Sequence, residues 1–92
     1  MSDKPEAIKA YKRLAASIVL SAVRDYKRAF KQYLKHGKDR RRLSLETRKN
    51  LDYCPKFFAS KYYETLSDLD GKEMQKSIER RCYKELGIEI QE

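Results

Sequence analysis

Apolar residues recur at alternating steps of three and four along the first third of the chain. The series comprises Ile8, Tyr11, Ala15, Ile18, Ala22, Tyr26, Ala29 and Tyr33. Because this spacing puts all of them on one face of a helix, it predicts a single long helix over about residues 5–36. Asp3 is the expected N-cap, with Glu6 completing a capping box, and Gly37 suits the left-handed position that follows a helix.

The middle of this helix, residues 15–23, is apolar almost all round. A helix with one side in water would have no need for apolar residues at Ala16 and Leu20. We therefore expect the segment to be buried on more than one side, at the centre of the fold, where it can also form a dimer seam.

The remaining chain predicts a basic loop, three shorter helices and a short C-terminal tail. We place the loop at about 37–43 and the helices at about 44–54, 55–67 and 71–86. Ser44 and Asp70 are the expected N-caps, and Ser60 is an expected internal cap. Pro55 predicts a break or a fresh helix start. Gly87 is expected to end the last helix, with the next residue folded back in a Schellman-type contact.

The fold class follows from few turn residues and many aromatic ones. Three glycines and two prolines in 92 residues are too few for a multi-stranded sheet, and the length fits one domain, residues 1–92. The second half of the chain supplies the aromatic part of the expected core: Phe57, Phe58, Tyr62, Tyr63, Leu66 and Leu69. We predict an all-α fold, a small bundle of three to five helices built around the long N-terminal helix.

Three segments carry a resemblance to a known group. They are YKRA at residues 26–29, FFAS at 57–60 and LSDLDG at 66–71. In this pattern, which covers most of the chain, the sequence resembles small helical proteins of unknown function that prophages and integrative mobile elements of Gram-positive bacteria encode. The resemblance implies a mobile-element context and no particular mechanism.

The chain is poor in residues that catalyse reactions or hold metals. Cys54 and Cys82 match no CxxC spacing and are expected to be buried thiols, and His36 is the single imidazole. Asp68 and Asp70 lie close together, but Asp70 is better explained as an N-cap. We therefore predict no enzyme, no metal site and no cofactor.

Nothing in the sequence predicts a membrane partner. The chain starts Met-Ser-Asp-Lys-Pro with no apolar signal core behind it, and the apolar run at 15–23 falls far short of the roughly 20 residues that cross a bilayer. An interfacial helix is disfavoured because the apolar face of the first helix is committed to the core. The expected location is the cytoplasm.

Positive charge is concentrated in the first half of the chain. Residues 1–42 carry thirteen lysines and arginines against four acids, whereas residues 43–92 carry nine against ten, for a net charge of +8. Projected at 100° per residue, most cations of the first helix fall on a stripe that faces away from its apolar side. A stripe followed by an arginine-rich loop is typical of phosphate binding, although a solvated face that maintains solubility is the alternative. The candidate nucleic-acid-binding residues are Arg13, Arg24, Lys27, Arg28, Lys31, Lys35, Lys38, Arg40, Arg41 and Arg42.

A helix-turn-helix is a second hypothesis, with residues 62–66 as its first helix and 67–71 as its turn. The second helix would offer Lys72, Lys76, Arg80, Arg81 and Lys84, diluted by Glu73, Glu79 and Glu85. Tyrosines that stack on bases are a further option, but helical spacing favours core or interface positions for Tyr11, Tyr26 and Tyr33.

Three functions remain open at this stage. The favoured one is a small basic accessory protein of a phage or mobile element that binds nucleic acid, preferably DNA, without catalysis. The second is an anti-CRISPR-like inhibitor that binds a host defence nuclease. The third is a structural homodimer that pairs through the apolar segment of the first helix.

Overall fold

The computed structural model describes residues 5–88, with side chains from residue 9 onward. It contains four α-helices and one 3₁₀ turn: α1 (Pro5–Lys35), η1 (Arg40–Arg42), α2 (Leu45–Phe58), α3 (Lys61–Leu66) and α4 (Gly71–Leu86). No strand occurs in the described range, so the predicted all-α class is confirmed. The expected cap Asp3, the side chain of Glu6 and the tail 89–92 lie outside the described residues.

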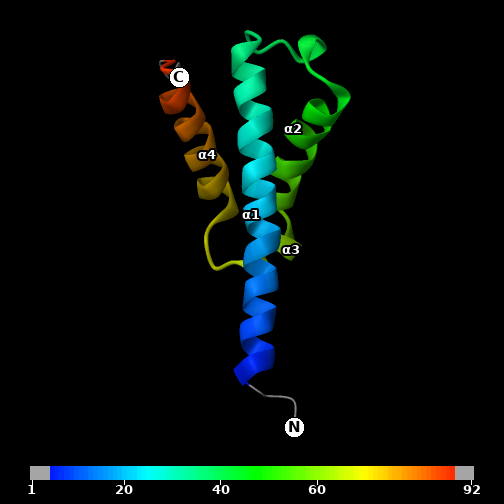
Figure 1. Ribbon diagram of the computed structural model, residues 1–92, viewed down its shortest axis with the longest axis vertical. Coiled ribbons are helices and arrows are strands. Elements are labelled where there is room, and N and C mark those ends of the chain that lie inside the picture. The colour runs from blue at the N-terminus through cyan, green and yellow to red at the C-terminus, as the bar shows by residue number, and fades with distance from the viewer. Residues whose placement is uncertain (1–4, 89–92) are drawn as a thin grey trace.

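Helix α1 runs the length of the molecule, and the other helices pack around its C-terminal part (Figure 1). α2 and α4 flank it on two sides, α3 lies at the base of α2, and both α2 and α3 contact α1. The N-terminal part of α1 extends beyond the bundle, so the molecule measures 55 Å in its longest direction and only 25 by 20 Å across. The bundle built around one long helix is therefore as predicted.

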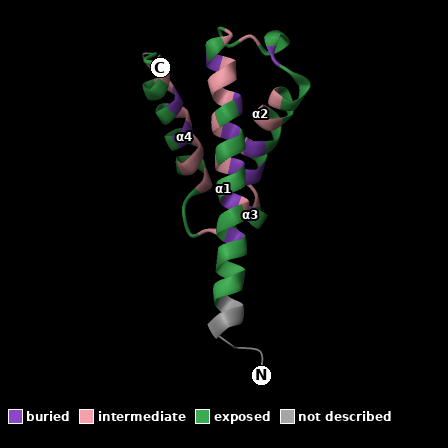
Figure 2. Cartoon of the chain, viewed as in Figure 1, coloured by how far each residue is buried: buried purple, intermediate pink, exposed green. Residues whose placement is uncertain are grey.

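The core lies where α1, α2, α3 and α4 meet (Figure 2). Its buried members are Val19, Ala22, Tyr26, Leu34, Cys54, Phe57, Phe58, Tyr63, Ile78 and Cys82. The Tyr63 ring packs edge-to-face against the rings of Phe57 and Phe58, with centroids 5.7 Å apart in both pairs. This T-shaped geometry is favourable for aromatic rings. The end of α2 and α3 thus form the expected aromatic part of the core, with Leu66 packed against it. Tyr62 and Leu69, also expected there, are instead 55% and 62% exposed, because they lie on the outer sides of α3 and of the connection that follows it.

The helix starts are fixed by the predicted capping residues. The Ser44 hydroxyl accepts a hydrogen bond from the Thr47 amide at 3.1 Å, and Ser60 does the same for the Tyr63 amide at 3.1 Å. Asp70 accepts from two first-turn amides of α4. Each cap satisfies an amide that the helix itself cannot pair.

The ends of α1 and α4 are Schellman motifs. Gly37 and Gly87 adopt φ values of 66° and 67°, the left-handed conformation that costs glycine least. The Ile88 amide donates to the Tyr83 carbonyl at 3.0 Å, which is the predicted fold-back. The Lys38 amide donates in the same way to the carbonyl of Tyr33 at 2.8 Å.

The predicted break at Pro55 is wrong, because α2 continues through the proline to Phe58. A proline inside a helix costs about 3 kcal/mol. Phe57 and Phe58, which follow it, are both buried, and burying each phenylalanine contributes about 1.5–3 kcal/mol. The packing of these rings on α1 therefore outweighs the local preference, and the predicted helices 44–54 and 55–67 become 45–58 and 61–66.

Within one chain, residues 15–23 are not buried on more than one side, so the expected place at the centre of the fold is not found. Ala15 and Val19 are buried, but Ala16 is exposed and Leu20 is 58% exposed. Tyr11, expected in the core or an interface, is 57% exposed and therefore lies outside the core of the single chain. The reason is geometric, since the flanking helices leave the side of α1 that carries Ala16 and Leu20 uncovered and do not reach its projecting end.

Candidate functional site

The outer face of α1 carries part of the predicted basic stripe. Arg24, Arg28 and Lys35 are exposed, and within the described part of the chain none has an ion-pair partner within 4.0 Å. They span about 16 Å of helix at 1.5 Å per residue. Arg13 is also exposed, on the projecting end of the helix. These four cations face away from the core, as predicted.

Lys27 and Lys31 depart from that prediction, because they lie against α4. Both ammonium groups contact the Glu85 carboxylate, at 2.8 Å for Lys27 and 3.0 Å for Lys31. The hydrogen bonds from these two lysines lower the pKa of Glu85 from 4.5 to about 2. The stripe is thus bordered by α4, which packs on the neighbouring side of α1 through Phe30 and Tyr83.

Two of the three acids that seemed to dilute the charge of α4 are directed toward α1. Glu85 meets the lysines of α1, and Glu79 accepts hydrogen bonds from the Tyr26 hydroxyl and from Gln75 at 3.0 Å. Burial, with a further contribution from Glu79, raises the pKa of Tyr26, so its hydroxyl keeps the proton that it donates. Of the three acids, only Glu73 remains uncommitted on the exposed side.

The outer face of α4 is therefore strongly basic. Its cations recur every four residues, a spacing that aligns side chains along one side of a helix, and all of them are exposed. The row consists of Lys72, Lys76, Arg80 and Lys84. The Arg80 guanidinium makes one hydrogen bond, to the Ser77 hydroxyl at 3.4 Å.

A groove of about 500 Å³ connects the basic faces of α1 and α4. It is lined by Lys27 from α1 and by Arg81, Lys84 and Glu85 from α4. Because Glu85 is already paired with two lysines, the groove keeps an excess of positive charge. The outer face of α1, this groove and the row on α4 together form what we call the α1–α4 basic surface.

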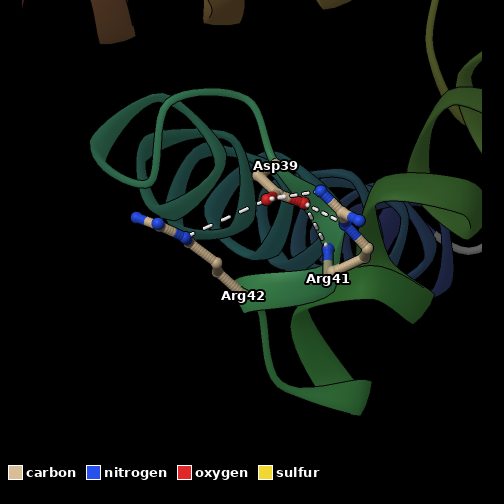
Figure 3. Close-up of polar contacts among 3 residues, drawn as sticks. All are labelled: Asp39, Arg41 and Arg42. Atoms are coloured by element: carbon tan, nitrogen blue, oxygen red, sulfur yellow. Dashed lines mark hydrogen bonds and ion pairs between the residues drawn. The ribbon is translucent and has the colours of Figure 1, made fainter.

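The predicted arginine-rich loop is an ordered 3₁₀ turn organised by Asp39 (Figure 3). One carboxylate oxygen accepts hydrogen bonds from the Arg41 amide at 3.0 Å and from its Nε at 3.1 Å, and Arg42 Nε lies 3.9 Å from the other oxygen. These contacts, led by those from Arg41, lower the pKa of Asp39. Nevertheless the side chains of Arg41 and Arg42 remain 90% and 71% exposed.

Arg40 and Lys38 fasten the turn to the rest of the fold. The Arg40 guanidinium contacts Asp52 of α2 at 2.7 Å, and the Lys38 ammonium lies 5.6 Å from the ring centroid of Tyr83 on α4. Each of these two cations thus already has an interaction partner within the protein, a carboxylate for Arg40 and an aromatic ring for Lys38. Of the predicted loop residues, Arg41 and Arg42 are thus the ones that offer most charge to a partner.

The helix order of the second hypothesis is present, with α3, a short connection and α4 following one another. The connection starts at Ser67, whose hydroxyl accepts from the Leu69 amide at 3.1 Å, and ends at the N-cap Asp70. Sequence reasoning gave the cations of α4 less weight because it counted Glu79 and Glu85 with them. Projecting α4 at 100° per residue would have put Glu85 on the side of the buried Ile78 and Cys82, but it leaves Glu79 at the border between that side and the basic row.

Other site chemistry is sparse in the part of the chain that the structure describes. No cluster of three His, Cys, Asp or Glu side chains that could hold a metal ion occurs between residues 9 and 88. Cys54 and Cys82 are free and buried, as predicted, and burial raises the pKa of Cys54 to about 11. None of the described helices combines the length and apolar character needed to cross a membrane.

No protein-family model, curated protein or solved structure matches the chain.

Proposed function

We propose that the protein binds nucleic acid, without catalysis, through the α1–α4 basic surface. The single observation that carries this proposal is that Glu79 and Glu85 are directed toward α1 and paired with its side chains. This orientation leaves the outer sides of two neighbouring helices, and the groove between them, with a marked excess of lysine and arginine.

The binding would be dominated by phosphate contacts. Lysines and arginines that neutralise phosphates release condensed counterions, so affinity falls steeply as salt increases. Arg24, Arg28 and Lys35 supply cations on α1 without internal partners in the described residues, and the row on α4 supplies more. Arg41 and Arg42 extend the surface at one end. The preference for DNA and the mobile-element context stay predictions.

A binding assay with matched charge variants tests the proposal. Fluorescence anisotropy would follow labelled duplex DNA, single-stranded DNA and RNA as protein is added at low salt. We expect the triple variant R24Q/R28Q/K35Q, and separately K76Q/R80Q/K84Q, to weaken binding by at least about tenfold, or about 1.4 kcal/mol. The replaced residues are all exposed, so the fold should be kept.

The control variant removes the same number of charges from another face. Lys49, Lys56 and Lys61 are exposed on α2 and α3, and K49Q/K56Q/K61Q lowers the net charge equally. We expect this control to bind within about threefold of the original protein, about 0.6 kcal/mol. Equal losses in all three variants would indicate unspecific attraction and contradict the proposed surface. No binding at low salt would contradict the function itself.

Anti-defence inhibition, the second function that the sequence left open, has a distinguishable outcome. An inhibitor would use the same cations on an acidic patch of a protein. Copurification from a host lysate after nuclease treatment separates the two, because a nucleic-acid binder loses its partners and an inhibitor keeps one. A retained protein, together with absent binding in the anisotropy assay, would favour inhibition.

A further inference from the structure

The projecting end of α1 exposes apolar side chains that the bundle does not cover. Every residue from 9 to 14 is exposed, including Tyr11 and Leu14. Leu20, farther along α1 where the other helices pack, and Leu69, on the connection between α3 and α4, are exposed as well. A short helical end without tertiary contacts is marginally stable in water, and large exposed apolar side chains that cluster usually mark an interaction site.

A groove of about 790 Å³ lies beside this end of α1. One wall is α1 itself, where the small residues Ala15 and Ala16 allow another helix to approach closely. The other wall consists of apolar residues from the end of α3, the connection and the start of α4: Leu66, Leu69 and Met74. The groove has the apolar lining that suits a helix of a partner molecule.

The two walls of the groove carry opposite charges. Residues 9–14 of α1 contain Lys9, Lys12 and Arg13 and no acid, whereas residues 64–73 contain four acids and one lysine. Lys12 on one wall and Asp68 on the other both line the groove. Neither makes an ion pair with any residue that the structure describes. A surface with both signs of charge across an apolar centre is complementary to a copy of itself.

We propose that the occupant of this groove is a second copy of the chain, with the two α1 helices antiparallel across a two-fold axis near Ala16. Each projecting helix end would then cover the apolar wall of the partner, and Lys9, Lys12 and Arg13 would face the acidic segment 64–73 across the interface. A parallel pair would instead place these three cations beside their own copies. Residues 9–23 provide about 22 Å of helix for the contact.

This dimer does not depend on nucleic-acid binding, because apart from Arg13 it uses a different part of α1. Its residues lie toward the N-terminal end, whereas Arg24, Arg28 and Lys35 lie toward the C-terminal end. The two proposals can therefore fail separately.

Sedimentation equilibrium on the full chain tests the proposal at protein concentrations from about 1 µM to about 1 mM, a range that covers weak and tight dimers. We expect a dimer of twice the 11.0 kDa chain mass. Ala16→Glu and Leu20→Glu should each raise the dimer dissociation constant by at least about tenfold, because they bury a charge in the seam. Both positions are exposed within one chain, and circular dichroism would verify that each variant keeps its helices.

Leu45→Glu provides the control, since Leu45 is equally exposed but lies on α2. It should leave the dissociation constant unchanged. Lys12→Asp and Asp68→Lys should each weaken the dimer, and the combined exchange should restore it, because the pair forms between copies. A monomer at all concentrations would overturn the proposal and leave the groove to a different partner. A dimer that Ala16→Glu and Leu20→Glu leave intact would overturn it equally.

Discussion

The hydroxyl groups of the two buried tyrosines, Tyr26 and Tyr63, should affect the stability of the fold in different ways. Tyr26 donates its hydroxyl hydrogen to Glu79 and thereby joins α1 to α4. Tyr63 is fully buried among Phe57 and Phe58, yet its hydroxyl has no hydrogen-bond partner in the described part of the chain. A buried polar group contributes to stability when it is paired and costs stability when it is not.

Removing each hydroxyl should therefore have opposite results. Tyr26→Phe leaves the Glu79 carboxylate without a donor from α1, and we expect a loss of about 1.5–3 kcal/mol in the free energy of unfolding. Tyr63→Phe removes an unpaired polar group and should change the stability by less than about 0.5 kcal/mol or increase it. Urea unfolding followed by circular dichroism measures both. A loss in Tyr63→Phe as large as that in Tyr26→Phe would show that the Tyr63 hydroxyl is paired in solution.

At the scale of helices, the contact between α1 and α4 depends on Glu85 and should make stability vary with pH. The pKa of Glu85 is lowered from 4.5 to about 2 in the folded protein by Lys27 and Lys31. The charged form is thus favoured by folding. Its contribution is complete above about pH 4.5 and is lost as the pH falls toward 2.

Glu85→Gln should abolish this part of the pH dependence. The stability difference between the original protein and the variant should be constant above pH 4.5 and shrink between pH 4.5 and about 2, measured by thermal unfolding. Glu73→Gln is the control, because Glu73 is exposed and makes no ion pair with the residues described. A difference that stays constant down to pH 2 would contradict the pairing of Glu85 with the two lysines.

The helices were predictable wherever local signals decided them. The periodicity and Gly37 indicated α1, and Asp70 with Gly87 indicated the bounds of α4 to the residue. Pro55 misled the prediction because a local rule about proline carries no information on the burial of Phe57 and Phe58. Burial depends on contacts with α1, which lies far away in sequence.

The candidate site was predictable only in part, for a similar reason. Helical projection alone identified Arg24 and Arg28 as outward residues. It could not tell that Lys27 and Lys31 border α4, because their partner Glu85 lies more than fifty residues away along the chain. The basic row on α4 received too little weight in part for the same reason: a projection of α4 places Glu85 near the buried side, but the direction of Glu79 is set by its hydrogen bond with the distant Tyr26.

At the scale of the whole molecule, the proposed function predicts a specific salt dependence. The logarithm of affinity for duplex DNA should fall linearly with the logarithm of salt concentration, by about 0.9 per neutralised phosphate. R24Q/R28Q/K35Q should therefore have a shallower slope, by about 0.9 for each phosphate that the variant no longer neutralises, measured by anisotropy at several salt concentrations. A weaker affinity with an unchanged slope would mean that these cations do not bind phosphates.

The two buried cysteines give the molecule one internal reporter on each flanking helix. Cys54 of α2 lies beside Ile18 and Ala22 of α1, and Cys82 of α4 lies 3.5 Å from the Lys27 carbonyl oxygen. A thiol reagent can reach either sulfur only when the helix that carries it separates from α1. The two labelling rates, followed by mass spectrometry on the unaltered chain, therefore distinguish a bundle that opens as one cooperative unit from one that releases α2 and α4 separately.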